Sequence, residues 1–318
     1  MKILLIRLSS IGDVILTTPL LRCLKTQLPS SQLHVITKPL SAQLLQGNPF
    51  IDSLIEYDGS ALQLSELHSQ HYDCIIDLHN NHRSRRLRRS FPCRSLVYRK
   101  ENFAKFILVL LKRDIMSGRH VVDRYFDAVK PLGVVNDGKG LELSPFSFQS
   151  PLFSTSRPFV VIACGAQHET KRIPPDKIAL IANSIDAPVA LLGDNSDGLR
   201  IRHLALSSNV VNLCGQTTLT ESAAIISQAS AVVTSDSAMM HVAAAYRRKV
   251  LALWGSTSPR FGFWAYATDR TDYTVPSLPC WPCRRMGSSR CPKGHFHCMM
   301  NQDYNAIVSQ LKSILSAN

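Results

Sequence analysis

The sequence predicts an α/β protein of two domains, each built on a parallel sheet with helices on both faces. The chain has 318 residues, enough for two domains of ordinary size, and 45% of them are hydrophobic, enough for two cores. Short apolar runs alternate with helical patterns in both halves, and such alternation with short connections favours parallel sheets. A Ser- and Pro-rich stretch, residues 144–158, separates the halves and is interpreted as an interdomain linker.

The expected strands are apolar runs bounded by polar or turn residues, as buried parallel strands require. In the first half they lie at residues 2–8, 33–37, 53–57, 74–78 and 95–98, with helices between them and at 103–111 and 121–130. In the second half they lie at residues 159–163, 189–192, 210–213, 231–234 and 250–254. We expect domains at residues 1–153 and 154–318, with the last helix a candidate to pack back on the first domain. Ligands of such sheets bind beyond the carboxyl ends of the strands.

Composition restricts the class of protein. Arg7 interrupts the first apolar run too early for a signal peptide, and the longest later run, residues 106–111, is too short to span a bilayer. We therefore expect a cytoplasmic protein. Five of the nine cysteines lie scattered, mostly within apolar segments, which suits reduced thiols. The net charge is +13, and residues 82–130 alone hold fourteen Lys or Arg against four Asp or Glu. Such a patch implies an anionic partner: nucleic acid, an acidic membrane surface or a phosphorylated substrate.

The first motif is RLSSIGDVILTTP, residues 7–19, where the first predicted strand ends and a helix begins. It lacks the G-x-G-x-x-G fingerprint, which argues against a nicotinamide enzyme. Asp13 stands in the first helical turn. Two interpretations remain open for it: a helix cap, or a general base facing a ligand cleft.

Two further motifs follow strands of the second half. In CGAQHETKRIPPDKIALIA, residues 164–182, Lys171 precedes a helix that proline can open, and it is either part of a solvated basic pair or a clamp for a diphosphate. TSDSAMMHVAAA, residues 234–245, begins a helix whose N-terminus suits an anion. Ser237 can cap this helix or donate to a phosphate, Asp236 can accept backbone N–H groups or a ribose hydroxyl, and His241 taken alone is more often structural.

These motifs together resemble glycosyltransferase family 9, the ADP-heptose:lipopolysaccharide heptosyltransferases. The resemblance is also carried by residues 212–257, NLCGQTTLTESAAIISQASAVVTSDSAMMHVAAAYRRKVLALWGST. The resemblance implies a GT-B fold, two Rossmann-like domains facing a central cleft. It also implies inverting transfer from an ADP-activated sugar without a metal ion or other cofactor.

The resemblance assigns roles to single residues. Asp13 corresponds to the catalytic base, and Lys171 to the lysine that contacts the donor diphosphate. The donor site is then expected to include Gly165, Asp236, Ser237, Ala238 and His241, and the acceptor site Ser10 and Gly12. Ala238 stands where the family usually has Gly, and Cys164, Ile173 and Ser256 also depart from its pattern, which leaves the exact donor sugar open.

The basic window fits an acceptor made of lipid A and acidic Kdo sugars, because Arg binds both phosphates and carboxylates. We expect Arg83, Arg85 and Arg86 to bind that acceptor; a solvated helix face is the alternative. The segment ENFAKFILVLLKR, residues 101–113, is either a core helix, the preferred interpretation, or a contact with the inner membrane surface.

Four cysteines near the C-terminus, Cys280, Cys283, Cys291 and Cys298, have a spacing that a structural zinc site can use, but reduced thiols or a disulfide are preferred. A nucleic-acid-binding protein is a rival interpretation, although the basic window has few aromatic residues for stacking bases. A GT-B protein that only binds sugar nucleotide is another, against which Asp13, Lys171 and His241 argue. The expected partners are an ADP-sugar donor, an anionic glycolipid acceptor and the inner membrane, with no nucleic acid.

Overall fold

The computed structural model describes residues 1–148 and 157–317 and divides into two compact units. The first comprises Met1–Glu101 and Arg119–Ser144, and the second comprises Asn102–Gly118 and Pro145–Asn318. The domain boundary predicted at residue 153 and the middle of the predicted linker lie outside the described residues. Within the described ranges, no helix is both long and apolar enough to cross a membrane.

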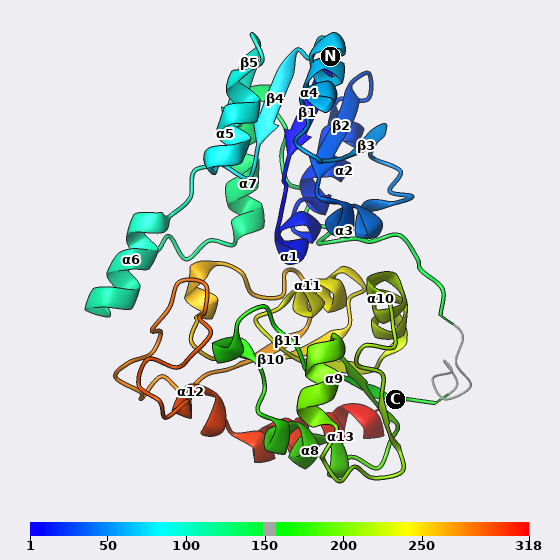
Figure 1. Cartoon of the computed structure of the whole chain (residues 1–318), viewed down its shortest axis with the longest axis vertical. Helices are drawn as coiled ribbons and strands as arrows, with labels where there is room; N and C mark the ends of the chain where they lie inside the picture. The colour runs from blue at the N-terminus through cyan, green and yellow to red at the C-terminus, as the bar shows by residue number, and fades with distance from the viewer. Residues whose placement is uncertain (149–156, 318) are drawn as a thin grey trace. The chain divides into compact units, whose positions relative to one another are not determined.

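The first unit contains a five-stranded parallel sheet of order β3-β2-β1-β4-β5 (Figure 1). Alternate residues of β1 face opposite sides: Leu4 and Ile6 pack with Leu67 and Leu87 from two helices, and the residues between them are also fully buried. Helices therefore cover both faces. The elements are β1 (Lys2–Ile6), α1 (Ile11–Ile15), α2 (Thr18–Gln27), β2 (Gln32–Thr37), α3 (Pro39–Ala42), η1 (Gln43–Leu45), β3 (Ser53–Glu56), α4 (Ala61–Ser69), β4 (Cys74–Asp77), α5 (His82–Arg89), β5 (Arg94–Val97), α7 (Val121–Val129) and η2 (Lys130–Leu132).

The second unit contains a six-stranded parallel sheet of order β11-β10-β9-β6-β7-β8. Side chains of α8 and of the C-terminal α13 share one core with alternate residues of its strands, and α11 lies on β9 and β10. The elements are α6 (Asn102–Leu111), β6 (Val160–Ala163), η3 (Glu169–Lys171), α8 (Pro175–Asn183), β7 (Val189–Leu192), α9 (Asn195–Ile201), β8 (Val210–Asn212), α10 (Leu219–Gln228), β9 (Ala231–Ser235), α11 (Ala238–Ala245), β10 (Lys249–Leu253), η4 (Pro259–Phe261), β11 (Arg270–Tyr273), α12 (His297–Met300) and α13 (Tyr304–Ser316).

All ten predicted strands are present within one or two residues of their expected bounds, and the predicted α/β class with two parallel sheets is confirmed. The structure adds β11, a short polar strand at the edge of the second sheet that apolar patterning does not reveal. The preferred interpretation of residues 103–111 as a core helix is wrong. Only Leu108 of α6 is buried, and several of its large apolar side chains are exposed.

Each sheet has a point where the strand order reverses, and ligands of open α/β sheets bind beyond the strand ends there. In the first sheet this point lies between β1 and β4, and in the second it lies between β6 and β9. The motif with Asp13 follows β1, the motif with Lys171 follows β6, and Asp236 follows β9. The sequence motifs therefore stand at the two places where this architecture binds ligands.

Candidate functional site

The centre of the site in the second unit is an ion pair between Lys171 and Asp236. Lys171 Nζ lies 2.8 Å from Asp236 Oδ2, and the two side chains are only 15% and 16% exposed. The hydroxyl of Thr257, which follows β10, donates to the same carboxylate oxygen at 2.8 Å. Burial raises the pKa of Asp236, but the Lys171 ammonium and the Thr257 hydrogen bond outweigh it, and the pKa is lowered overall. The site thus holds an ionised carboxylate and an oriented ammonium.

The helix beside this pair, α11, begins directly after Asp236. Ser237 occupies its N-cap position in extended backbone, as predicted, but its hydroxyl lies 3.0 Å from that of Thr234 and does not cap the helix. Ala238 is the first helical residue, and His241 is buried one turn later at 4% exposure. The start of α11 therefore adds backbone N–H groups and a positive dipole end next to Lys171.

The structure gives Gly165 and Asp236 partners that the sequence did not predict. A Cβ atom at Gly165 would collide with the carboxylate of Asp197, so this glycine makes room for a buried acid at the start of α9. Asp236 accepts from the side chains of Lys171 and Thr257, where backbone N–H groups or a ribose hydroxyl were expected. The contacts of both residues with a donor remain predictions.

The centre of the site in the first unit is a buried ion pair between Arg7 and Asp13. Arg7 Nη2 lies 2.7 Å from Asp13 Oδ1, with exposures of 7% and 20%. Asp13 also closes the capping box of α1, because its Oδ2 accepts from the Ser10 hydroxyl at 2.8 Å and from the Ser10 backbone N–H at 3.2 Å. The cap interpretation therefore describes part of what Asp13 does.

The pKa of Asp13 reflects this environment. Burial raises it, but the Arg7 charge and the Ser10 hydrogen bonds outweigh burial and lower it from 3.8 to about 2. Two further groups, His79 and Lys100, interact electrostatically with Arg7 and Asp13. Burial and the Arg7 and Lys100 charges lower the pKa of His79 to about 4, so His79 is neutral at physiological pH. Asp13 is therefore ionised at neutral pH, but it is a weak base while Arg7 is paired with it.

The predicted acceptor arginines all lie on α5, which follows β4 at the same switch point. Asn81 caps this helix, and Ser84 and Leu87 are the residues on its buried face. Arg83, Arg85 and Arg86 are exposed, and the Arg85 Nε–H donates to Asn80 Oδ1 at 3.0 Å. The structure thus gathers these arginines on one exposed helix surface next to the loop that holds His79.

The four C-terminal cysteines lie in one segment, and all nine cysteines of the chain are free. Cys280 Sγ lies 3.8 Å from His295 Nε2. Within the described residues, no group of three or more His, Cys, Asp or Glu side chains is placed so that it could hold a metal ion. This geometry gives the zinc interpretation of Cys280, Cys283, Cys291 and Cys298 no support.

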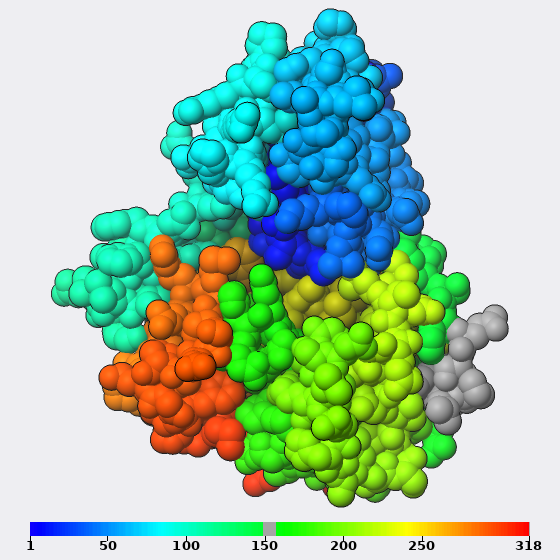
Figure 2. All heavy atoms as spheres, viewed as in Figure 1, coloured from blue at the N-terminus to red at the C-terminus, as the bar shows by residue number. Residues whose placement is uncertain are grey.

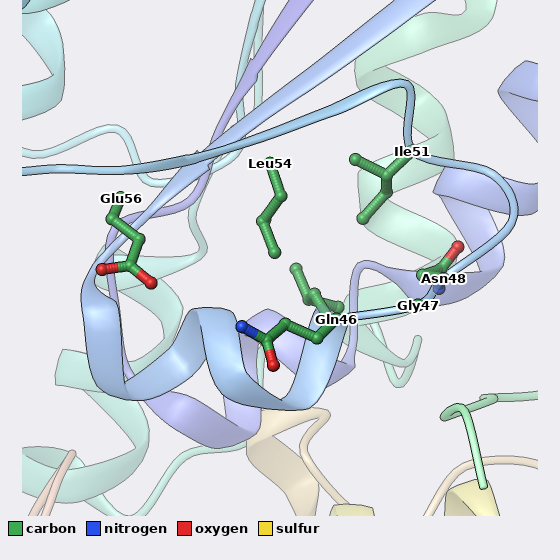
Figure 3. Close-up of a pocket in the computed structure, with 7 residues that line it drawn as sticks. Gln46, Gly47, Asn48, Ile51, Leu54 and Glu56 are labelled. Atoms are coloured by element: carbon green, nitrogen blue, oxygen red, sulfur yellow. The ribbon is translucent and has the colours of Figure 1, made fainter.

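A pocket of about 320 Å³ lies elsewhere in the first unit, between the edge strand β3 and residues 45–51 before it. Figure 3 shows Leu54 pointing toward the helical turn that leads to Gln46, with Glu56 at one side. Its charged wall residue is acidic, which does not suit a phosphorylated ligand. It contains none of the predicted site residues, and it lies away from the switch point between β1 and β4.

Arg7 in the first unit and Thr257 in the second take part in these two centres, but the motif analysis predicts no role for either. The signal for Arg7 was a charged residue directly after an apolar strand, where burial demands a partner of opposite charge. Thr257 gave no such signal, because threonine is common after strands. The predicted residues Ser10 and Gly12 lie at the start of α1, where Ser10 is bonded to Asp13.

Comparisons with known proteins agree with this arrangement. The family model described as glycosyltransferase family 9 (heptosyltransferase) matches residues 63–293. Lipooligosaccharide heptosyltransferase 2 of Haemophilus influenzae is 28% identical over 299 residues, covering 82% of this chain and 85% of that protein. ADP-heptose lps heptosyltransferase II of E. coli has a similar structure, with a TM-score of 0.75, 20% identity and coverage of 100% and 99% of the two chains. The structure of E. coli heptosyltransferase WaaC with ADP aligns with a TM-score of 0.69, 18% identity and coverage of 99% and 100%. These likenesses confirm the predicted GT-B fold.

Proposed function

This chain belongs to glycosyltransferase family 9 (heptosyltransferase), and we propose on that premise that it transfers heptose from ADP-heptose to the core of a lipopolysaccharide, with inversion at the anomeric carbon. The relatives named above are heptosyltransferases of lipopolysaccharide or lipooligosaccharide, which supports the acceptor class. The observation that most favours the reaction is the Lys171 ammonium, held by Asp236 beside the start of α11, because the ammonium and the helix N-terminus both attract a diphosphate.

The donor end of the reaction needs a group that stabilises the negative charge on departing ADP. The Lys171 ammonium is suited to that role, because Asp236, itself held by the Thr257 hydroxyl, keeps the group in place before the donor arrives. The N-terminus of α11 adds a second favourable field for the same charge. We therefore expect these two groups to take the place of a metal ion at the diphosphate. Asp236 itself repels phosphate and is better suited to a hydroxyl of the ribose or the heptose.

The acceptor end of the reaction needs a base, and Asp13 is the proposed one. An alcohol is a poor nucleophile until its proton leaves, and its acidity rises as the new C–O bond forms. A carboxylate whose pKa is about 2 can take that proton only late in bond formation, unless the acceptor first loosens the Arg7–Asp13 pair. Attack by this hydroxyl from the face opposite ADP inverts the anomeric centre.

The acceptor itself is expected to be anionic, since Arg83, Arg85 and Arg86 are exposed on α5 beside the first switch point. Guanidinium groups bind phosphate and carboxylate in a bidentate manner. Both groups occur on lipid A bearing Kdo, which is one proposed acceptor; the lipopolysaccharide core is the other. Because the reaction joins a nucleotide sugar to a lipid-linked acceptor, we expect the protein to work at the cytoplasmic face of the inner membrane.

The test is a donor panel. The purified protein is incubated with Kdo-bearing lipid A and with ADP-heptose, ADP-glucose, a GDP-sugar or a UDP-sugar, in the presence and absence of EDTA. We expect nucleotide release with ADP-heptose, a mass gain of one heptose on the acceptor, an inverted anomeric configuration by NMR, and no loss of rate in EDTA. Preference for a GDP- or UDP-sugar would overturn the donor assignment, and retention of configuration would overturn the role of Asp13.

A further inference from the structure

An exposed apolar stripe runs along α6 of the second unit. Phe103, Phe106 and Leu110 are spaced three and four residues apart, which places them on one helix face, and they are 71%, 45% and 61% exposed. Leu111 and Ile115 extend the stripe, each 54% exposed. Among the described residues, twelve large hydrophobic side chains are exposed, and five of them lie between residues 103 and 115. Such a concentration marks an interaction surface.

The stripe is held outward by contacts of Lys105 on α6 and of Lys112 and Asp114, which follow the helix. Lys112 Nζ donates to the carbonyl oxygens of Cys280 and Pro282 at 2.9 and 2.7 Å. Lys105 Nζ lies 4.3 Å from the ring centre of Phe263, and Asp114 pairs with Arg260 at 3.1 Å. The helix and the cysteine-rich segment, residues 280–298, are therefore fixed to one another within the same unit. Figure 2 shows them side by side and exposed on one face.

The cysteine-rich segment contributes positive charge to this surface. Its side chains Arg284, Arg285, Arg290 and Lys293 are exposed, and between them Met286 is 71% exposed. Residues 102–118 and 280–298 together hold seven Lys or Arg and one Asp, a net charge of +6. Apolar side chains surrounded by cations are the two features that bind a helix to an anionic lipid surface.

From this combination we propose that the α6 surface, defined as residues 102–115 and 280–298, docks on a bilayer that contains anionic lipids. A second copy of the chain is a poorer occupant, because it would bring the same +6 charge to the interface. Ten helical residues span about 15 Å, so α6 lies in the lipid interface and does not cross it. The inference deepens the proposed function, on which it rests for its purpose, because a lipid-linked acceptor is presented at such a surface.

The experiment measures binding of the full chain to extruded vesicles by co-sedimentation. One vesicle type is phosphatidylcholine alone, and the other is three parts phosphatidylcholine to one part phosphatidylglycerol. The apolar variant replaces Phe103, Phe106 and Leu110 with Ser; its matched control, Leu62→Ser with Leu199→Ser, removes side chains of similar exposure elsewhere. The charge variant is Arg284→Gln with Arg285→Gln, and its control is Arg202→Gln with Lys312→Gln, two exposed cations outside the surface.

We expect the wild type to bind the anionic vesicles, less so at high salt, and to bind phosphatidylcholine weakly. The apolar variant should lose at least about tenfold in partition, the charge variant a similar amount, and the controls should match the wild type. Thermal unfolding of all variants verifies that they fold. The proposal would be overturned if the wild type bound neither vesicle, or if either surface variant bound the anionic vesicles as strongly as the wild type. A wild-type dimer that the apolar variant dissociates, without any effect of vesicles, would also overturn it. If vesicle binding holds while ADP-heptose turnover on detergent-dispersed acceptor fails, the proposed function is wrong and the docking surface stands.

Discussion

Replacing Asp13 with Asn separates the two roles that the structure gives this carboxylate. Asn retains an oxygen that can accept the hydrogen bonds from Ser10, and Asn is as good as Asp at helix starts. It removes the negative charge that pairs with buried Arg7. It also removes the ability to accept a proton from an acceptor hydroxyl. Stability and turnover should therefore both fall, for different reasons and by different amounts.

The loss of stability follows from the pKa of Asp13, which folding lowers from 3.8 to about 2. Lowering a carboxyl pKa by one unit on folding stabilises the folded state by about 1.4 kcal/mol, so the ionised carboxylate contributes about 2 kcal/mol at neutral pH. Because the folded pKa is the lower one, this contribution is complete above about pH 4 and is lost as the pH falls toward 2. The difference in stability between the wild type and Asp13→Asn should shrink over that window. The loss of turnover is larger, on the order of 10²–10⁴-fold, if the carboxylate is the base.

A matched control isolates catalysis from folding. Asp137 pairs with Arg22, a buried arginine of the same unit, at 2.8 Å, and hydrogen bonding from Arg22 lowers its pKa to about 2. Arg22 keeps a second partner, Glu142 at 2.8 Å, so Asp137→Asn should destabilise the protein by no more than Asp13→Asn does while leaving kcat near that of the wild type. The assays are thermal unfolding as a function of pH, and initial rates of ADP release at saturating donor and acceptor. Both variants must bind ADP as the wild type does.

One outcome refutes the reasoning about the base. If Asp13→Asn is folded, binds ADP normally and turns over within a few-fold of Asp137→Asn, then the carboxylate is only a cap and an ion-pair partner. A different outcome refutes the reasoning about Arg7. If the acid limb of the kcat/KM profile lies at pH 4 or above in the wild type, the Arg7–Asp13 pair does not govern the pKa of the free protein. Replacing Arg7 with Gln should move that limb upward.

The remaining predictions concern the donor, the acceptor and metal ions. Lys171→Ala should weaken ADP binding by roughly 1.5–3 kcal/mol in calorimetry, because a charged hydrogen bond is lost. Lys249→Ala, which removes a more exposed ion pair of the same unit, should leave ADP binding unchanged. Equal ADP affinities of Lys171→Ala and the wild type would remove Lys171 from the donor site. Neutralising Arg83, Arg85 and Arg86 together should raise the KM for acceptor and leave ADP binding unchanged, and parallel losses of both would contradict the assignment of α5 to the acceptor. Dialysis against EDTA should leave ADP-heptose turnover unchanged, and restoration of a lost rate by one added divalent ion would show that Lys171 does not suffice for the diphosphate.

Much of the fold was predictable because buried parallel strands are continuous apolar runs that local patterning reveals. The edge strand β11 was missed because its residues, Arg270–Tyr273, are polar and only partly buried. The helix α6 was misinterpreted for the opposite reason. Its residues are as apolar as those of a core helix, and local sequence does not tell whether such a helix is covered by the protein or left exposed.

For the candidate site too, features set by local sequence could be predicted, and features set by contacts between distant residues could not. Asp13, Lys171 and Asp236 could be singled out because each follows an apolar run, where a strand ends and ligands of α/β sheets bind. The pairing of Lys171 with Asp236 could not, because 65 residues separate them and they meet only because β6 and β9 are neighbours at the centre of the second sheet. Strand order is set by packing across the whole unit, and no local pattern records it.

Arg7 affects both the stability of the first unit and the pKa of Asp13, and the sequence motif alone does not reveal either effect. A charged side chain that is 7% exposed directly after β1 is stable only with a partner, and the charged partner of Arg7 is the proposed base itself. The pair therefore links the stability of the first unit to the basicity of Asp13: the contact that stabilises the fold also lowers the pKa. An acceptor that draws Arg7 away, through a phosphate or a carboxylate of its own, would release Asp13 to act as a stronger base only when that acceptor is bound. An anionic acceptor could thus activate the carboxylate that deprotonates it, and a neutral sugar of the same shape could not.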